Sequence, residues 1–128
     1  MIKSSTKILI VDDELTSRRI MTRIIRNQWD CNILFADDGS EALKVMLKEY
    51  PSLVILDIIM PFMNGIQVLQ TMRKSAKLAK MNVLACTGVD DSKIVKQILK
   101  YGVLDYMIKP INKEAFIAKL TKLFEKIN

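Results

Sequence analysis

Five side chains that could act on phosphate or on a metal ion each come directly after a short apolar run. Asp12 and Asp13 follow the first run, Asp57 the third, Thr87 the fourth and Lys109 the fifth. If these runs are neighbouring strands, the carboxylates meet, and two like charges about 4 Å apart repel by about 4 kcal/mol at an effective dielectric of 20. A proton or a cation must then compensate the charge, so the pattern indicates a site for a positive ion.

The absence of histidine narrows the chemistry of such a site. It excludes Ser-His and Cys-His nucleophilic pairs and a histidine-ligated transition metal. Carboxylate oxygens instead favour Mg²⁺, which binds a few carboxylates and keeps several waters. Cys31 and Cys86 have neither the spacing of a metal site nor the density of a disulfide scaffold. We expect both to be reduced thiols at the edge of the core of a cytoplasmic protein.

Apolar runs of strand length must position these side chains. They are rich in β-branched and other apolar residues without clean alternation, which is typical of parallel strands covered on both faces. The runs occupy residues 7–11, 31–36, 53–56, 82–86 and 104–108. Segments with apolar residues at helical spacing follow each run. No apolar run is long enough to span a bilayer, and the chain opens without an apolar signal segment, so a protein without membrane insertion is expected.

Turn residues agree with this division. Gly39 and Gly65 stand at helix entries. Pro51 prevents the second helix from continuing, and Gly102 suits the end of the fourth. Alternating strands and helices with right-handed crossovers predict an α/β, flavodoxin-like (βα)5 doubly wound sheet of five parallel strands in the order 2-1-3-4-5. We expect residues 1–128 to form one domain without an output domain.

This strand order makes the first and third strands neighbours, so Asp12, Asp13 and Asp57 converge at the carboxyl edge of the sheet, where such folds bind ligands. Mg²⁺ there would neutralise an incoming phosphoryl group, while Lys109 and Thr87 hold its oxygens. Asp57, alone at its strand end, could accept the phosphoryl group as an acyl phosphate. Each residue alone has a simpler interpretation as a turn, a cap or a solvated lysine. Their joint placement supports the hypothesis.

The motifs ILIVDDE, VILDIIMPFMNG, ACTG and YMIKP, in this order, resemble the response-regulator receiver family over essentially the whole chain. The resemblance implies that Asp57 is the phosphoaccepting aspartate. It implies that Asp12 and Asp13 form the acidic pair that binds Mg²⁺, and that the backbone carbonyl of Ile59 is a further metal ligand. The donor would be the phosphohistidine of a sensor histidine kinase or of a histidine phosphotransfer protein, since this chain has no histidine.

The resemblance also assigns a switch. It implies that Lys109 binds phosphate, that Thr87 is the switch hydroxyl, that Tyr106 changes rotamer on activation, and that the Lys109–Pro110 bond is cis. Phosphorylation would draw Thr87 inward, let Tyr106 fill the vacated space and shift the surface of the fourth helix, fifth strand and fifth helix. We expect a regulatory phosphoacceptor that assists its own phosphorylation and dephosphorylation, rather than an enzyme.

The same surface carries most of the positive charge. Residues 93–128 hold eight lysines and three acids, which is +5 of the net +6. A solvated helical face is the simpler interpretation, and a downstream protein that binds this surface is the functional one. Nucleic acid is disfavoured as a partner, because neither a helix-turn-helix nor an aromatic and basic platform is visible.

Some positions depart from the family pattern. Asn64 stands where Asp is common, and Asn also suits the turn before Gly65. Ile59 and Val89 are apolar next to the expected phosphoryl site, where a polar side chain could orient water, so we predict slow self-hydrolysis of the aspartyl phosphate. Asp37 and Asp38 also follow a strand, and we interpret them as turn residues.

Two other functions remain open. DDELT approximates the D-x-D-x-T start of haloacid-dehalogenase-like, Mg²⁺-dependent phosphatases, with Asp12 as nucleophile. The match fails at Glu14, and no late acidic pair follows Lys109. A non-phosphorylated receiver-like binding module is the other alternative, although the complete set of acids and lysine argues against it.

Overall fold

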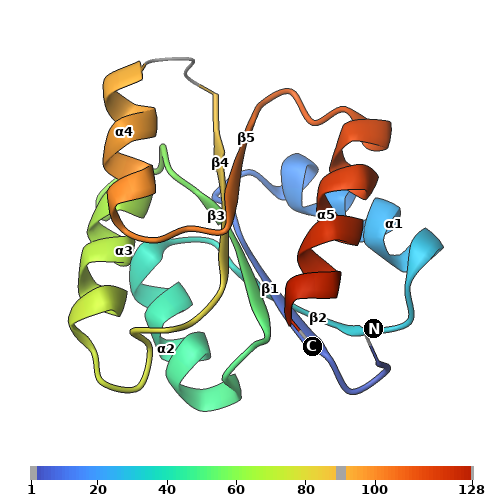
Figure 1. Cartoon of the computed structure of the whole chain (residues 1–128), viewed down its shortest axis with the longest axis horizontal. Helices are drawn as coiled ribbons and strands as arrows, with labels where there is room; N and C mark the ends of the chain where they lie inside the picture. The colour runs from blue at the N-terminus through green and yellow to red at the C-terminus, as the bar shows by residue number, and fades with distance from the viewer. Residues whose placement is uncertain (1–2, 89–91, 128) are drawn as a thin grey trace.

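The computed structural model describes residues 3–88 and 92–127, which form a five-stranded parallel sheet flanked by helices (Figure 1). The strands are β1 (Lys7–Val11), β2 (Asn32–Ala36), β3 (Leu53–Asp57), β4 (Val83–Thr87) and β5 (Asp105–Ile108). The helices are α1 (Leu15–Gln28), α2 (Gly39–Glu49), α3 (Gly65–Lys74), α4 (Ser92–Lys100) and α5 (Lys113–Ile127). The strand order is β2-β1-β3-β4-β5, so the predicted fold and topology are confirmed.

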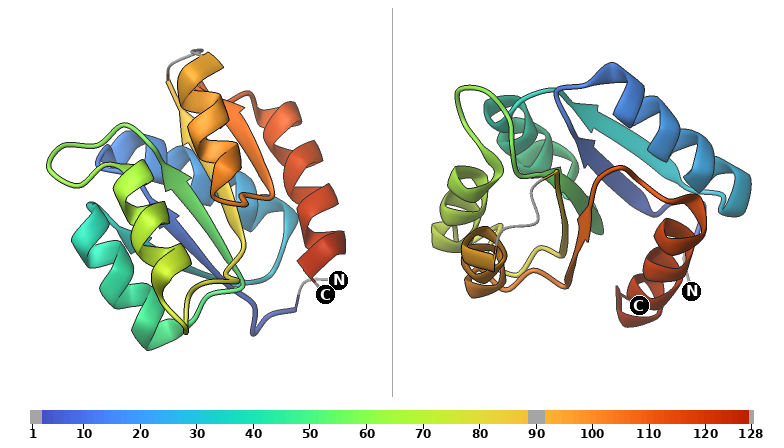
Figure 2. Two further views of the ribbon diagram at one scale, coloured as in Figure 1. Left: turned by 60° about the vertical axis from the view of Figure 1, so that its left-hand side comes forward. Right: turned by 90° about the horizontal axis from the view of Figure 1, so that it is seen from above.

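The helices cover the two faces of the sheet in separate layers. α1 and α5 lie on one face and α2, α3 and α4 on the other, as Figure 1 and the view from above in Figure 2 show. In β1, Ile8 and Ile10 pack with the first layer. Leu9 and Val11 pack with the second. Because side chains alternate along a strand and both faces are covered, β3 and β4 are buried throughout, which explains the missing alternation in their sequences.

Loop residues near the carboxyl edge cap the helices that follow them. The Asp38 side chain accepts a hydrogen bond from the Glu41 N–H at 2.8 Å, so this predicted turn residue is the N-cap of α2. Asn64 accepts from the Gln67 N–H at 3.0 Å, and the Gln67 side chain accepts from the Asn64 N–H at 2.9 Å. This capping box explains Asn at a position where Asp is common, because either side chain can accept the bond.

Several single-residue predictions can be compared with the structure. Gly102 follows α4 with a φ of +69°, and the Lys109–Pro110 bond is cis, as expected. Cys31 and Cys86 are free thiols. The placement of Cys86 at the core edge is wrong, because β4 is an inner strand covered on both faces and Cys86 is only 1% exposed. Within the described ranges, no helix has the length and apolar character needed to cross a membrane.

Candidate functional site

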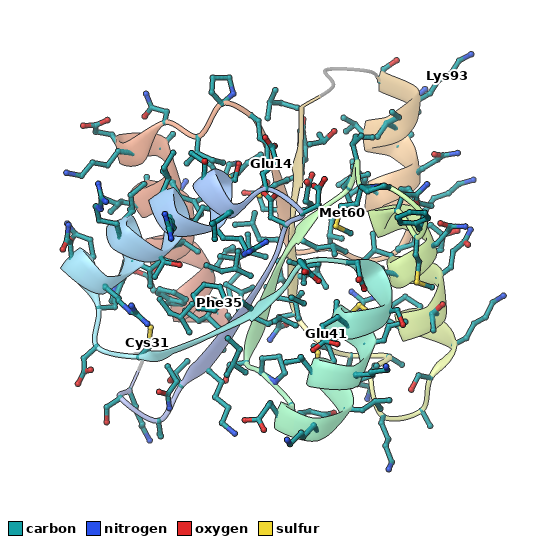
Figure 3. All side chains as sticks on the ribbon, turned by 180° about the vertical axis from the view of Figure 1, so that it is seen from behind. Glu14, Cys31, Phe35, Glu41, Met60 and Lys93 are labelled. Carbon is teal, nitrogen blue, oxygen red and sulfur yellow. The ribbon has the colours of Figure 1, made fainter. Side chains whose placement is uncertain are left out.

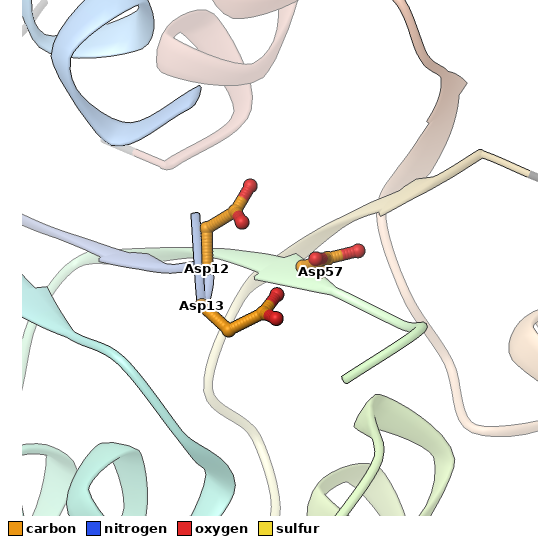
Figure 4. Close-up of side chains that lie close together, drawn as sticks. All are labelled: Asp12, Asp13 and Asp57. Carbon is orange, nitrogen blue, oxygen red and sulfur yellow. The ribbon is translucent and has the colours of Figure 1, made fainter. Parts of the chain in front are cut away.

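The carboxyl edge of the sheet brings three aspartates together. One carboxylate oxygen from each of Asp12, Asp13 and Asp57 lies within 4.8 Å of the others. Figure 4 shows these side chains at the ends of β1 and β3. Asp12 is fully buried and Asp57 nearly so, whereas Asp13 is exposed. The sequence placed these carboxylates at one edge, and the structure groups them with one member facing solvent.

Strand pairing and one glycine produce this arrangement. Val11 of β1 pairs with Leu56 of β3, so the residues that follow them in the chain lie side by side. Gly65, at the start of α3, lies so close to β3 that a Cβ there would be 2.6 Å from Ile58 Cα and 2.7 Å from the Asp57 carbonyl oxygen. Its N–H donates to the Ile58 carbonyl at 2.8 Å. Only glycine allows the loop after β3 to return this closely to the strand end.

Lys109 reaches the carboxylates from the end of β5. Its Nζ lies 2.7 Å from Asp12 Oδ2, 3.3 Å from Asp57 Oδ2 and 3.8 Å from Glu14 Oε1. Burial disfavours the Lys109 ammonium, but the hydrogen bond to Asp12 and the charge of Asp57 outweigh burial and raise the lysine pKa above its ordinary value. A single ammonium therefore faces several carboxylates, and it compensates their charge only in part.

Because Lys109 compensates the negative charge of the carboxylates only in part, the pKa of Asp57 remains raised. Burial, and then the neighbouring charge of Asp12, raise the pKa of Asp57 from an ordinary 3.8 to about 7. The charge and hydrogen bond of Lys109 and a backbone hydrogen bond from Ile59 oppose this rise without cancelling it. An ionised Asp57 would be stabilised by further positive charge at this edge.

The donor atoms of the cluster fit Mg²⁺. Asp12, Asp13 and Asp57 offer only hard oxygen ligands, and the exposed side of Asp13 leaves room for the waters that Mg²⁺ keeps. The absence of histidine removes the ligand that zinc and copper sites commonly use. Ile59, whose backbone N–H donates to Asp57, adjoins the cluster with its side chain 51% exposed.

The expected switch residues lie on β4, which pairs with β3, and on β5, which pairs with β4. Thr87 is fully buried at the end of β4, and its carbonyl accepts from the Lys109 N–H at 2.7 Å. Tyr106 of β5 is half-buried, pairs with Ala85 of β4 and packs against the core on the side of α2, α3 and α4. Val89 lies outside the described residues. The structure thus places Thr87 and Tyr106 on adjacent strands, and their switching roles remain predictions.

Two contacts of Asp12 were missed in the sequence. The Arg18 Nη1 donates to the Asp12 carbonyl at 2.6 Å, and the Glu14 N–H donates to Asp12 Oδ1 at 2.9 Å. Arg18 lies four residues after Glu14, in the first turn of α1. Residues four apart in a helix lie on the same face, so this spacing could have indicated that the Arg18 side chain reaches back to the end of β1. These bonds orient Asp12 from the helix side.

Comparison with known proteins identifies the family of the chain. The family model described as "Response regulator receiver domain" matches residues 8–121. The chain is 34% identical to the chemotaxis protein CheY of Pseudomonas aeruginosa over 122 residues, which cover 95% of this chain and 98% of that protein. It is also 34% identical to the probable transcriptional regulator ycf27 of Porphyridium aerugineum, over 95% of this chain but 49% of that protein. The chain thus spans about half the length of the ycf27 relative.

Solved structures share the fold. The receiver domain of AraT, a response regulator from Geobacillus stearothermophilus, matches with a TM-score of 0.84 and 28% identity over 95% of both chains. The signal receiver domain of a DNA-binding response regulator (merR) from Colwellia psychrerythraea matches with a TM-score of 0.87 over 94% of this chain and 99% of that chain, and at 24% identity it shows the fold alone. The chain belongs to the response regulator receiver domain family, a regulatory family of two-component signalling.

Proposed function

We propose that Asp57 accepts a phosphoryl group from the phosphohistidine of a sensor histidine kinase or of a histidine phosphotransfer protein. The observation that supports this most directly is the nearly buried Asp57 carboxylate, held beside two other aspartates with the Lys109 ammonium 3.3 Å away. In the transfer, the N–P bond of the donor breaks, an O–P bond to an Asp57 carboxylate oxygen forms, and the donor imidazole nitrogen takes up a proton. The product is an acyl phosphate.

Side chains of the cluster would bind the metal and the new phosphoryl oxygens. Asp12, Asp13 and Asp57, with the Ile59 carbonyl, would hold Mg²⁺, which supplies positive charge as the phosphoryl group arrives. The Lys109 ammonium is already within hydrogen-bond distance of Asp57 and can move its contact to a phosphoryl oxygen. The Thr87 hydroxyl would bind another oxygen, and both contacts would favour the phosphorylated conformation, as a two-state switch requires.

Mass spectrometry of the intact protein tests the proposal. Incubation with Mg²⁺ and acetyl phosphate should add one phosphoryl group to wild type and none to Asp57→Asn. Asp37→Asn is the matched control, because Asp37 also follows a strand of the sheet but is exposed. Equal labelling of Asp57→Asn, or phosphate mapped to another residue, would overturn the assignment.

The phosphatase alternative requires Asp12 as nucleophile, and the contacts of Asp12 argue against it. This side chain is fully buried, its Oδ2 accepts from Lys109 at 2.7 Å, and its Oδ1 accepts from the Glu14 N–H at 2.9 Å. These contacts hold Asp12 as a ligand of the cluster, facing Lys109 and Glu14 rather than an incoming phosphate ester. Catalytic turnover of a phosphate ester that survives Asp57→Asn would nevertheless favour the phosphatase.

Signal output would pass through the surface of α4, β5 and α5, which binds a downstream protein. Tyr106 on β5 packs against the core next to the strand that carries Thr87, so a change at Thr87 has a short route to this surface. Phosphorylation should change amide hydrogen exchange in α4 and β5 but leave β2 unchanged. Identical exchange with and without phosphate would contradict this route. The free thiols of Cys31 and Cys86 agree with action in the reducing cytoplasm.

The aspartyl phosphate should hydrolyse slowly. Ile59 adjoins Asp57 and places an apolar, 51% exposed side chain where a polar one could orient the attacking water. Ile59→Asn should therefore speed the loss of phosphate, measured as the decay of the phosphorylated mass after removal of the donor. An unchanged decay rate would remove the basis of this expectation.

A further inference from the structure

The arginines of this chain are concentrated on one helix. Arginine occurs at positions 18, 19, 23, 26 and 73, so four of the five lie on α1, whereas the 15 lysines are spread over the other elements and loops. Arg73 has a structural role, because it donates to the carbonyls of Ala79, Met81 and Tyr101. α1 itself contains no Asp or Glu. A guanidinium binds carboxylates with two parallel hydrogen bonds, which lysine cannot do.

These arginines border a groove between α1 and β2. The groove has a volume of about 600 Å³ and is lined by α1 residues and by Phe35 of β2. Figure 3 labels Phe35 on this strand. Phe35 is 45% exposed and Leu15, at the start of α1, is 50% exposed, so the groove also presents apolar surface. It therefore combines a cationic wall with an apolar floor.

The arginines of α1 form no ion pair with an acidic side chain within the described part of the chain. The ion pairs found there involve Lys7, Lys109 and Lys119, and none involves an arginine. Arg18 is held by its hydrogen bond to the Asp12 carbonyl. The other α1 arginines, at positions 19, 23 and 26, are exposed. Three guanidinium groups on one helix are thus available to an anionic partner.

The strand below this wall is an edge of the sheet. Among the described strands, β2 pairs with β1 alone, so the backbone on its outer side can pair with an added strand. Side chains of an added strand alternate between the two faces, so every second one would lie on the α1 side. Asp37 and Glu41 adjoin Arg18 at one end of the groove, so acidic residues of a partner should lie toward Arg23 and Arg26 at the other end.

We propose that this groove binds an extended peptide segment of a partner protein, with acidic side chains on the α1 arginines, apolar side chains on Phe35 and Leu15, and its backbone paired with β2. This interaction is separate from phosphorylation of Asp57. A nucleic acid fits less well, because its phosphodiester backbone offers only hydrogen-bond acceptors to a strand edge that presents both donors and acceptors. Only one exposed aromatic ring lines the groove, where single-stranded nucleic acids need successive stacking faces.

Fluorescence anisotropy tests the proposal with a labelled octapeptide, Glu-Ser-Val-Ser-Glu-Ser-Val-Ser, as the probe, because its every second residue places Glu and Val in turn on the α1 side. Wild type and Asp57→Asn should bind it equally. Arg19→Gln combined with Arg23→Gln should weaken binding about tenfold, as expected for two exposed ion pairs. The matched control is Lys44→Gln with Lys48→Gln, which removes two exposed charges four residues apart on α2 and should change binding less than about twofold.

Two further measurements address the apolar and backbone contacts. An octapeptide with Ser in place of Val should bind more weakly, and bound probe should slow amide exchange in β2. Absence of binding to wild type, equal losses for the arginine and lysine pairs, or unprotected β2 amides would each overturn the proposal. Tighter binding of a labelled single-stranded oligonucleotide, lost in the arginine variant, would assign the groove to nucleic acid instead.

Discussion

Replacing Asp57 with asparagine should stabilise the metal-free protein at pH 8. The amide has the shape of a protonated carboxyl and removes a charge that burial and Asp12 disfavour. A rise of the Asp57 pKa from 3.8 to about 7 corresponds to at most about 4 kcal/mol of folding free energy. Because Lys109 loses one of its partners in the variant, we expect a gain of about 2–3 kcal/mol.

The gain should depend on pH in a defined direction. Above about pH 7, Asp57 is ionised in both the folded and the unfolded wild type, and the unfavourable charge destabilises the fold fully. Between about pH 7 and pH 4, only the folded state binds the proton, so wild type becomes more stable as the pH falls. Below about pH 4 both states are protonated, and wild type and Asp57→Asn should have the same stability.

Urea unfolding measures this difference. Trp29 is the only tryptophan, and its ring packs edge-on against Phe124 with 4.9 Å between centroids, so its fluorescence should report on the core beside α1 and α5. Asp37→Asn, which removes an exposed carboxylate, should match wild type at pH 8. Excess Mg²⁺ should narrow the difference by stabilising wild type. An Asp57→Asn variant no more stable than wild type at pH 8, or a gain of equal size at pH 4, would refute the reasoning.

Three further substitutions test the surroundings of the site by urea unfolding. Lys109→Met should lower stability at pH 8 by about 2–4 kcal/mol, because it leaves the carboxylates of Asp12 and Asp57 without their ammonium partner. The loss of stability should be smaller in the Asp57→Asn variant, which has one carboxylate fewer. Equal losses in wild type and in Asp57→Asn would contradict this explanation. Gly65→Ala should lower stability by about 2–3 kcal/mol, because its Cβ would meet backbone atoms of β3, whereas Gly88→Ala, with no atom within 4 Å of the added Cβ, should have little effect. Phe62→Asn should raise stability by about 1 kcal/mol, because Phe62 is fully exposed at a φ of +66°, a region that Asn tolerates better; a less stable variant would contradict the backbone strain expected of Phe at this φ.

The elements, and the meeting of the candidate carboxylates at one edge of the sheet, could be predicted from the sequence because the signals are local. Uninterrupted apolar runs, helical spacing and turn residues such as Gly39 and Gly102 depend on neighbours within a few positions. The order of strands followed from general rules of chain connection. These rules place Asp12, Asp13 and Asp57 at one edge of the sheet, where the structure also groups them.

The environment of each residue was decided only by the tertiary structure. Asp12 and Asp13 are neighbours in the chain, yet one is fully buried and the other is exposed, because they point to opposite sides at the end of β1. Lys109 lies 97 residues from Asp12 but donates to it at 2.7 Å. The raised pKa of Asp57 results from burial by segments distant in sequence.

The groove between α1 and β2 is also a product of the tertiary structure. The sequence contains the arginines of α1 and the apolar Phe35, but only packing of the helix along the edge strand places them around one space. The pattern of apolar and turn residues within a segment determines whether it can form a helix or a strand. Contacts between distant segments set burial, charge compensation and the shape of the surface, because these quantities depend on which atoms exclude water from one another.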